Sequence, residues 1–155
     1  MSVAKARSSI RFTLTELREI KETIETLLGD TEYAPGKRSS YLMDALNNAF
    51  DANAKIRPYY EADIVDSEDV DRQFTMFIGQ LARATNIQNE VVESETIVEE
   101  NIDLNLNSSV SGLEQRNNEQ LKQAHTEIVK LIEALQLALD DDVLNNPETP
   151  PEVEE

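Results

Sequence analysis

The densest group of side chains that could bind a cation is an acidic run near the middle of the chain. It consists of Asp63-x-x-Asp66-Ser67-Glu68-Asp69-x-Asp71. A helix-loop-helix calcium loop needs oxygen ligands at alternate positions, a central glycine and a glutamate at position 12, and this run contains no glycine. Carboxylates in the first turn of a helix interact favourably with the helix dipole. We therefore interpret the run as the solvated start of a helix, and we predict no metal and no cofactor.

Side chains that could drive catalysis are scarce. The chain has no Cys, and His125 is its one histidine, which argues against thiolate nucleophiles, Cys-ligated zinc and Ser-His-Asp chemistry within one chain. The four glycines form no GxGxxG, GxxxxGK[ST] or GxSxG motif. The sequence therefore lacks the glycine pattern on which nucleotide-binding loops and the nucleophile elbow of hydrolases depend. We predict that the protein is not an enzyme. His125 is expected to flank a helix seam, and a pH-sensitive contact between paired chains is the alternative.

The charge of the chain limits the surfaces that it can bind. There are 31 Asp and Glu residues against 14 Lys and Arg residues, which gives a formal net charge of −17. Nucleic acids and anionic membranes repel such a chain, and no apolar stretch approaches the ~20 residues of a membrane span. We expect no direct nucleic-acid binding and no membrane association. The expected location is the cytoplasm, or a virion if the chain comes from a phage.

The first eleven residues are the exception to this negative charge. Lys5, Arg7 and Arg11 precede the first acidic residue, Glu16. Three cations make too few phosphate contacts for independent nucleic-acid binding. We predict that residues 1–11 form a flexible basic arm that docks on an acidic protein partner or on a neighbouring copy. Incidental composition at the start of the chain is the alternative.

A second candidate binding surface is a seven-residue repeat near the C-terminus. Leu121, Ile128 and Leu135 recur every seven residues, and so do Ala124, Leu131 and Ala138. A heptad repeat of apolar residues is typical of helices that pack along a seam. Alanine at one seam position favours close packing within the chain. Packing of Leu121, Ile128, Leu131 and Leu135 against another chain is the alternative.

Helical periodicity and capping signals define the elements that hold these residues. Thr13-x-x-Glu16 fits a capping box, and Gly29 fits the position that follows a helix end. A second helix, with Ala49 and Phe50 on its buried face, is expected to end at Arg57-Pro58. Further helices are predicted over 67–85, 87–100 and 113–139.

These predictions give an all-α fold, a small helical bundle of about four to five helices with a long C-terminal heptad-patterned helix and flexible ends. The expected organisation is a basic arm (1–11), an acidic helical domain (12–104), a linker (105–112), a long helix (113–139) and an acidic, proline-containing tail (140–155). The tail has the composition of a segment that does not fold alone.

Two functional hypotheses follow. The basic arm, the acidic helices, the absence of Cys and the polar tail suit a non-enzymatic structural or assembly protein. It would be an adaptor or a subunit of a larger complex, such as a phage virion component, and would act through protein contacts as a homo-oligomer or in a larger assembly. The alternative is an acidic inhibitor that mimics nucleic acid and blocks a basic protein groove. Residues 61–112 support that alternative, because twelve acidic and two basic residues give them a formal charge of −10.

Overall fold

The computed structural model describes residues 3–29, 35–61, 67–101 and 104–139, and all of these residues are helical. They form α1 (Val3–Gly29), α2 (Pro35–Glu61), α3 (Ser67–Asn101) and α4 (Leu104–Leu139). The described residues contain no strand, so the prediction of an all-helical protein is confirmed. The predicted ends of the first and last helices, at Gly29 and near Leu139, match the structure.

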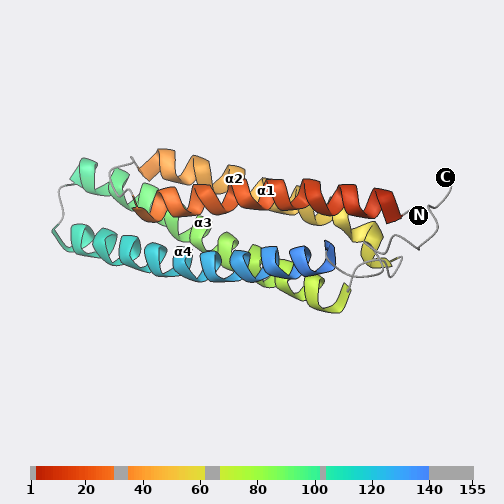
Figure 1. Cartoon of the computed structure of the whole chain (residues 1–155). Coiled ribbons are helices and arrows are strands. Elements are labelled where there is room, and N and C mark those ends of the chain that lie inside the picture. The colour runs from red at the N-terminus through yellow and green to blue at the C-terminus, as the bar shows by residue number, and fades with distance from the viewer. Residues whose placement is uncertain (1–2, 30–34, 62–66, 102–103, 140–155) are drawn as a thin grey trace.

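The four helices pack side by side as an antiparallel bundle. Figure 1 shows that each helix runs opposite to the one before it, with α1 and α2 in one layer and α3 and α4 in the other. Within the described ranges, α1 and α3 each pack against α2 and α4, and neither diagonal pair is in contact. As a consequence, α1 and α3 begin at the same end of the bundle, where α2 and α4 finish.

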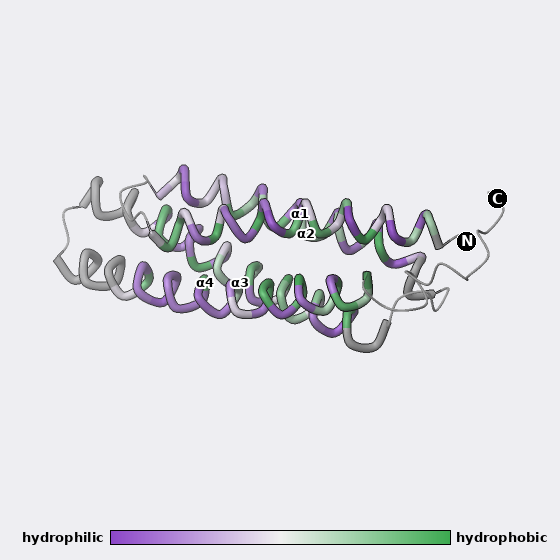
Figure 2. The backbone as a smooth tube through the Cα atoms, in the orientation of Figure 1, coloured by the Kyte–Doolittle hydropathy of each residue, from purple (hydrophilic) through white to green (hydrophobic). Residues whose placement is uncertain are grey.

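One apolar core runs between the two layers (Figure 2). Phe74 and Phe77 of α3 are its largest side chains, and both are 0% exposed. The other helices contribute stripes at intervals of three and four residues, and α2 buries mainly alanine, which lets its neighbours approach closely. Burial of each Leu, Ile or Phe side chain stabilises the fold by about 1.5 to 3 kcal/mol.

The start of α1 differs from the prediction. Residues 3–11 belong to the helix rather than to a flexible arm, because Ala6 and Ile10 extend the buried stripe and are 0% exposed. Thr13 lies inside the helix and is also 0% exposed, so the predicted capping box does not start α1. Residues 1–2 lie outside the described residues.

Three other predicted boundaries are wrong. Pro58 lies inside α2, near its end at Glu61, where a proline removes one of the last backbone hydrogen bonds while Ile56 remains buried in the core. The break predicted between 85 and 87 is absent, since Gln88 continues the buried face of α3. The predicted linker at 105–112 belongs to α4. The predicted tail at 140–155 lies outside the described residues.

Candidate protein-docking surface

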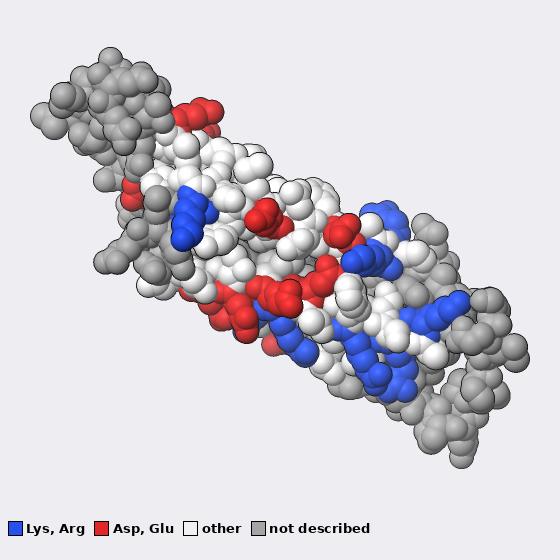
Figure 3. Space-filling model, turned by 90° about the horizontal axis from the view of Figure 1, so that it is seen from above, with Lys and Arg blue, Asp and Glu red and all other residues white. Residues whose placement is uncertain are grey.

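The antiparallel packing of α1 and α2 gathers basic residues at one end of the bundle. The start of α1 lies beside the end of α2, where the Ser9 hydroxyl donates to the Lys55 carbonyl oxygen at 3.5 Å. Lys and Arg side chains concentrate toward this end in the view from above (Figure 3). We call this surface the basic end and define it by five residues: Lys5, Arg7, Arg11, Lys55 and Arg57.

Lys55 of the basic end has several partners. Its Nζ lies 3.3 Å from Glu16 Oε1 and 3.9 Å from Asp51 Oδ2. The same Nζ lies 4.5 Å from the centroid of the Phe12 ring, which is a cation–π distance. Because Phe12 is 55% exposed, the basic end presents an aromatic surface as well as positive charge.

Arg7 and Arg11 have no such partners. In the part of the chain that the structure describes, no carboxylate pairs with either guanidinium, and Nε of Arg7 is buried without a hydrogen-bond partner. Arg11 is exposed. No described carboxylate therefore neutralises either of these two cations.

The structure separates the two predicted sets of partner-binding residues. The Lys5 and Arg11 side chains are exposed and Arg7 is half-buried, so an acidic partner can reach this surface. The seam residues Leu121, Ile128, Leu131 and Leu135 are all 0% exposed and contact the chain's own core. A second chain cannot reach them while the bundle stays closed.

The sequence did not predict that some apolar side chains of α2 are exposed. Phe50 was predicted on the buried face of α2, yet it is 53% exposed, and Met43 of the same helix is 49% exposed. The buried stripe of α2 follows Ala45, Ala49 and Ala52. A side chain one residue beyond Ala49 is rotated by about 100° from that stripe, and this rotation is the signal that places Phe50 outside.

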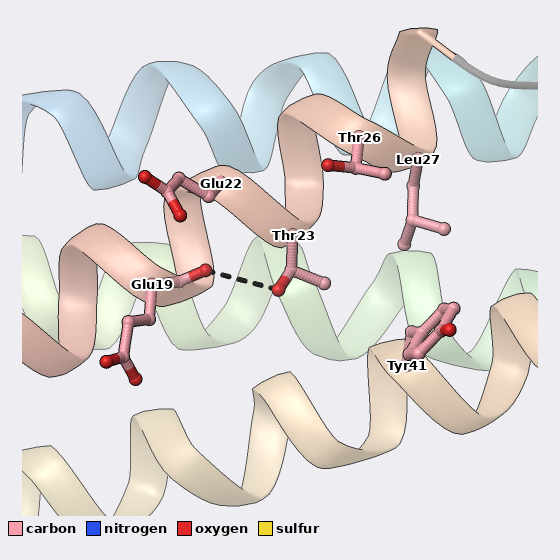
Figure 4. Close-up of a pocket in the computed structure, with 6 residues that line it drawn as sticks. All are labelled: Glu19, Glu22, Thr23, Thr26, Leu27 and Tyr41. Carbon is pink, nitrogen blue, oxygen red and sulfur yellow. Dashed lines mark hydrogen bonds between the residues drawn. The ribbon is translucent and has the colours of Figure 1, made fainter.

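A polar groove of about 390 Å³ runs between α1 and α2 (Figure 4). Tyr41 enters it from α2, and the Thr23 hydroxyl donates to the Glu19 carbonyl oxygen at 3.1 Å. The other lining residues are Glu22, Thr26 and Leu27. The carboxylates of Glu19 and Glu22 are exposed, so they lack the apolar enclosure that a catalytic acid needs.

His125 joins α4 to α1 in a second polar contact. Its Nε2 lies 3.0 Å from Glu25 Oε2, and Lys21 Nζ lies 3.6 Å from the same oxygen. The hydrogen bond with His125 lowers the pKa of the Glu25 carboxyl below its ordinary value, and Lys21 lowers it further. His125 is half-buried beside the buried Ala124, the position that the sequence predicts for it at the edge of the seam.

In the described ranges, no three His, Asp or Glu side chains lie together as metal ligands would. Of the acidic run that we considered for calcium, Asp63 and Asp66 lie outside the described residues, and Asp71 is exposed on α3. None of the four helices, as far as they are described, has a stretch apolar and long enough to cross a membrane.

Comparison with known proteins gives no match: no family model, no curated protein and no solved structure is similar to this chain.

Proposed function

We propose that the protein is a non-enzymatic structural or assembly subunit that binds protein partners through the basic end. The observation that supports this proposal is the separation of charge. Five cations lie toward one end of α1 and α2, in a chain whose formal net charge is −17. A local group of cations on an acidic chain steers an oppositely charged partner toward that place.

The chemistry of the surface favours an acidic protein over a nucleic acid. Glu16 and Asp51 lie among the cations and would repel phosphates. Phe12 adds exposed aromatic area beside Lys55, and aromatic side chains are enriched at the centres of protein interfaces. A partner with carboxylates around an apolar side chain would match this arrangement.

The proposed subunit would work in a larger complex, either with other copies of the chain or with a different protein. An adaptor or virion component of a phage is the form that the composition suits. The buried seam of α4 argues that any self-association uses the outer surface of the bundle, because the seam already packs on the chain's own core. Size-exclusion chromatography with light scattering tests for self-association.

Co-purification from the cells that produce the protein tests the proposed function. The variant Lys5→Gln, Arg7→Gln and Arg11→Gln should lose its partner. A control, Arg83→Gln, Arg116→Gln and Lys122→Gln, removes three positive charges at exposed positions elsewhere and should keep the partner. Equal recovery by both variants would contradict the proposal.

An acidic inhibitor that mimics nucleic acid is the second candidate. The exposed Glu90 and Glu93 on α3 favour it, together with the −10 charge of residues 61–112. Its test is neutralisation of five carboxylates to Gln: Glu90, Glu93, Glu95, Glu99 and Glu100. Loss of the partner from this variant, with retention by the basic-end variant, would favour the inhibitor.

A further inference from the structure

One side of the bundle carries a run of uncharged surface residues, although 29% of the chain is charged. On α2 these residues recur at intervals of four, three and four, and they are Met43, Asn47, Phe50 and Ala54. On α3 the intervals are the same, and the residues are Thr75, Gly79, Ala82 and Asn86. Residues at these intervals share one side of a helix. We call these eight residues, which are exposed except for the half-buried Ala82, the uncharged face.

Contacts with the other two helices show where the charged residues of α2 and α3 lie. Lys55 of α2 pairs with a carboxylate of α1, so the charged side of α2 faces α1. The Gln120 side chain of α4 hydrogen-bonds to the Gln80 side chain of α3. Arg72 and Arg83 are eight residues before and three residues after Gln80, so they lie on the α4 side of α3. The uncharged face therefore lies on the outside of the bundle where α2 and α3 adjoin.

A hydrogen bond between α2 and α3 fixes which residues of the face lie side by side. The Ser39 hydroxyl of α2 donates to Asn89 Oδ1 of α3. Because the two helices are antiparallel (Figure 1), eleven residues forward along α2 correspond to eleven residues back along α3. Phe50 therefore lies level with Ile78, next to Gly79.

The two halves of the uncharged face are complementary in shape. The α2 half presents two large apolar side chains, since Phe50 is 53% exposed and Met43 is 49% exposed. The α3 half has small residues, and no described neighbour lies within 4 Å of the position that a Cβ would take at Gly79. A glycine inside a helix is unfavourable relative to alanine. Packing within the described chain does not account for this glycine, whereas a large side chain from outside would fit over it.

Arg57 and Asp71 add complementary charge at one end of the face. Arg57 continues the α2 half after three residues, and Asp71 precedes the α3 half by four. Both side chains are exposed, and neither has an ion-pair partner among the described residues. Arg57 is eighteen residues after Ser39 and Asp71 is eighteen residues before Asn89, so the two residues lie level with each other.

We propose that the uncharged face binds a second copy of the chain about a two-fold axis that runs parallel to the helices. Rotation about this axis exchanges the two halves of the face and keeps every level unchanged, so α2 of each copy lies over α3 of the other. Phe50 of each copy then packs over Gly79 of the other, and Arg57 of each copy faces Asp71 of the other. The absence of charge between these residues lets two chains of net charge −17 approach with little repulsion.

This inference rests on the proposed function, because it names a second copy as one of the protein partners. The face does not include Lys5, Arg7 or Arg11, whose variants test the proposed function. The association of copies can also be measured on the purified chain with no other protein present. A chain that does not dimerise would leave the capture of an acidic partner intact, and a dimer that captures no partner would leave the uncharged face intact.

Sedimentation equilibrium of the full-length chain measures the association. The average mass should rise from 17.5 kDa toward twice that value as the concentration increases. Gly79→Gln fills the space under Phe50 of the other copy and should weaken the dimer by about tenfold or more. The control is Gly112→Gln, since Gly112 is also exposed inside a helix and has no described neighbour within 4 Å of an added Cβ. A chain that stays monomeric up to about 1 mM, or equal weakening by the two variants, would overturn the inference.

Charge reversals identify the occupant of the face. Arg57→Glu places two carboxylates opposite each other in the dimer, Asp71→Lys places two cations there, and each change should weaken the dimer by about tenfold. An equal mixture of the two variants should regain the wild-type affinity, because the introduced glutamate of one copy faces the introduced lysine of the other. Asp44→Lys and Arg83→Glu reverse exposed charges of the same helices away from the face and should each dimerise like the wild type. A mixture that associates as weakly as either face variant alone would overturn the two-fold contact.

Discussion

The two ends of the bundle use their polar residues differently. Toward the end where α1 finishes and α2 begins, three buried side chains donate to backbone carbonyl oxygens. These hydrogen bonds run from Arg38 to Leu27 at 2.9 Å, from Gln88 to Pro35 at 3.1 Å and from Asn117 to Ala84 at 2.7 Å. We call this the hydrogen-bonded end. At the basic end the polar residues are mostly exposed cations, and Arg7 and Arg11 have no ion pair among the described residues.

This difference predicts that the two ends contribute unequally to stability. Arg38 is 8% exposed and satisfies a carbonyl in the last turn of α1, where helix carbonyls lack partners within the helix. Removing such a group leaves a buried acceptor unpaired, which is costly. Exposed cations contribute little to stability, because water and salt screen them. The hydrogen-bonded end should therefore contribute more to the free energy of unfolding than the exposed cations of the basic end do.

The largest expected effect concerns the core that both ends share. Ile128 is 0% exposed, so Ile128→Asp places an unpaired charge in the core and should cost about 3 to 5 kcal/mol of the free energy of unfolding. Ile128→Leu keeps the volume and should cost less than about 1.5 kcal/mol. Urea unfolding measures both. If Ile128→Asp unfolds like the wild type but changes the oligomeric state, Ile128 faces another chain instead.

A matched substitution compares the two ends directly. Arg38→Met leaves the Leu27 carbonyl unpaired and should lower the free energy of unfolding by about 1 to 3 kcal/mol. Arg11→Met changes an exposed side chain and should alter it by no more than about 0.5 kcal/mol. Urea unfolding of both variants checks the difference. Equal losses would remove the distinction between the ends.

A substitution at Thr13 should change stability less, and the sign of the change tells whether Thr13 lies inside α1 or caps its start. Its hydroxyl is buried in α1, and Oγ1 has no hydrogen-bond partner in the described residues. Thr13→Val keeps the shape and removes the unpaired hydroxyl, so it should stabilise the protein by about 1 kcal/mol. A helix that began at Thr13 would instead lose its cap and about 1 kcal/mol. Thermal unfolding distinguishes the two signs.

The comparison also shows how much the sequence could predict. The spacing of apolar residues predicted the all-helical fold and the helix ends at Gly29 and Leu139. It could do so because the apolar stripe of each helix is buried in the core regardless of which helix it packs against. The continuous α3 was missed, because Gln88 is a polar residue on the buried side of the helix. It is tolerated there because its amide donates to Pro35, a partner that only the tertiary structure brings near.

The sequence predicted only part of the candidate site. Lys5, Arg7 and Arg11 stood out as a run of cations without acids. Lys55 lies far from them in the sequence, and it joins them only because α1 and α2 are antiparallel. Leu121, Ile128, Leu131 and Leu135 are buried in the chain's own core. Their spacing alone does not say whether they pack on a helix of the same chain or of another chain.

The smallest expected effect is the pH dependence of the contact between α1 and α4. The pKa of Glu25 is lowered in the folded protein, chiefly by the hydrogen bond with His125. A carboxylate with a lowered pKa adds stability above its unfolded value and loses it as the pH falls through the folded value. The wild type should therefore lose slightly more stability than Glu25→Gln below the ordinary value of 4.5. Urea midpoints across this range test the difference, with Glu114→Gln as a control at an exposed carboxylate.

The central claim is that partners bind at the basic end and not elsewhere along α1. A photo-crosslinking amino acid at Ser8 or at Thr26 tests it without changing any charge. Both positions are exposed, and their separation of eighteen residues is five turns, so they share one face of the helix. In the cells that produce the protein, Ser8 should give a crosslinked product with another protein and Thr26 should give none. Crosslinking from Thr26 with none from Ser8 would contradict the account.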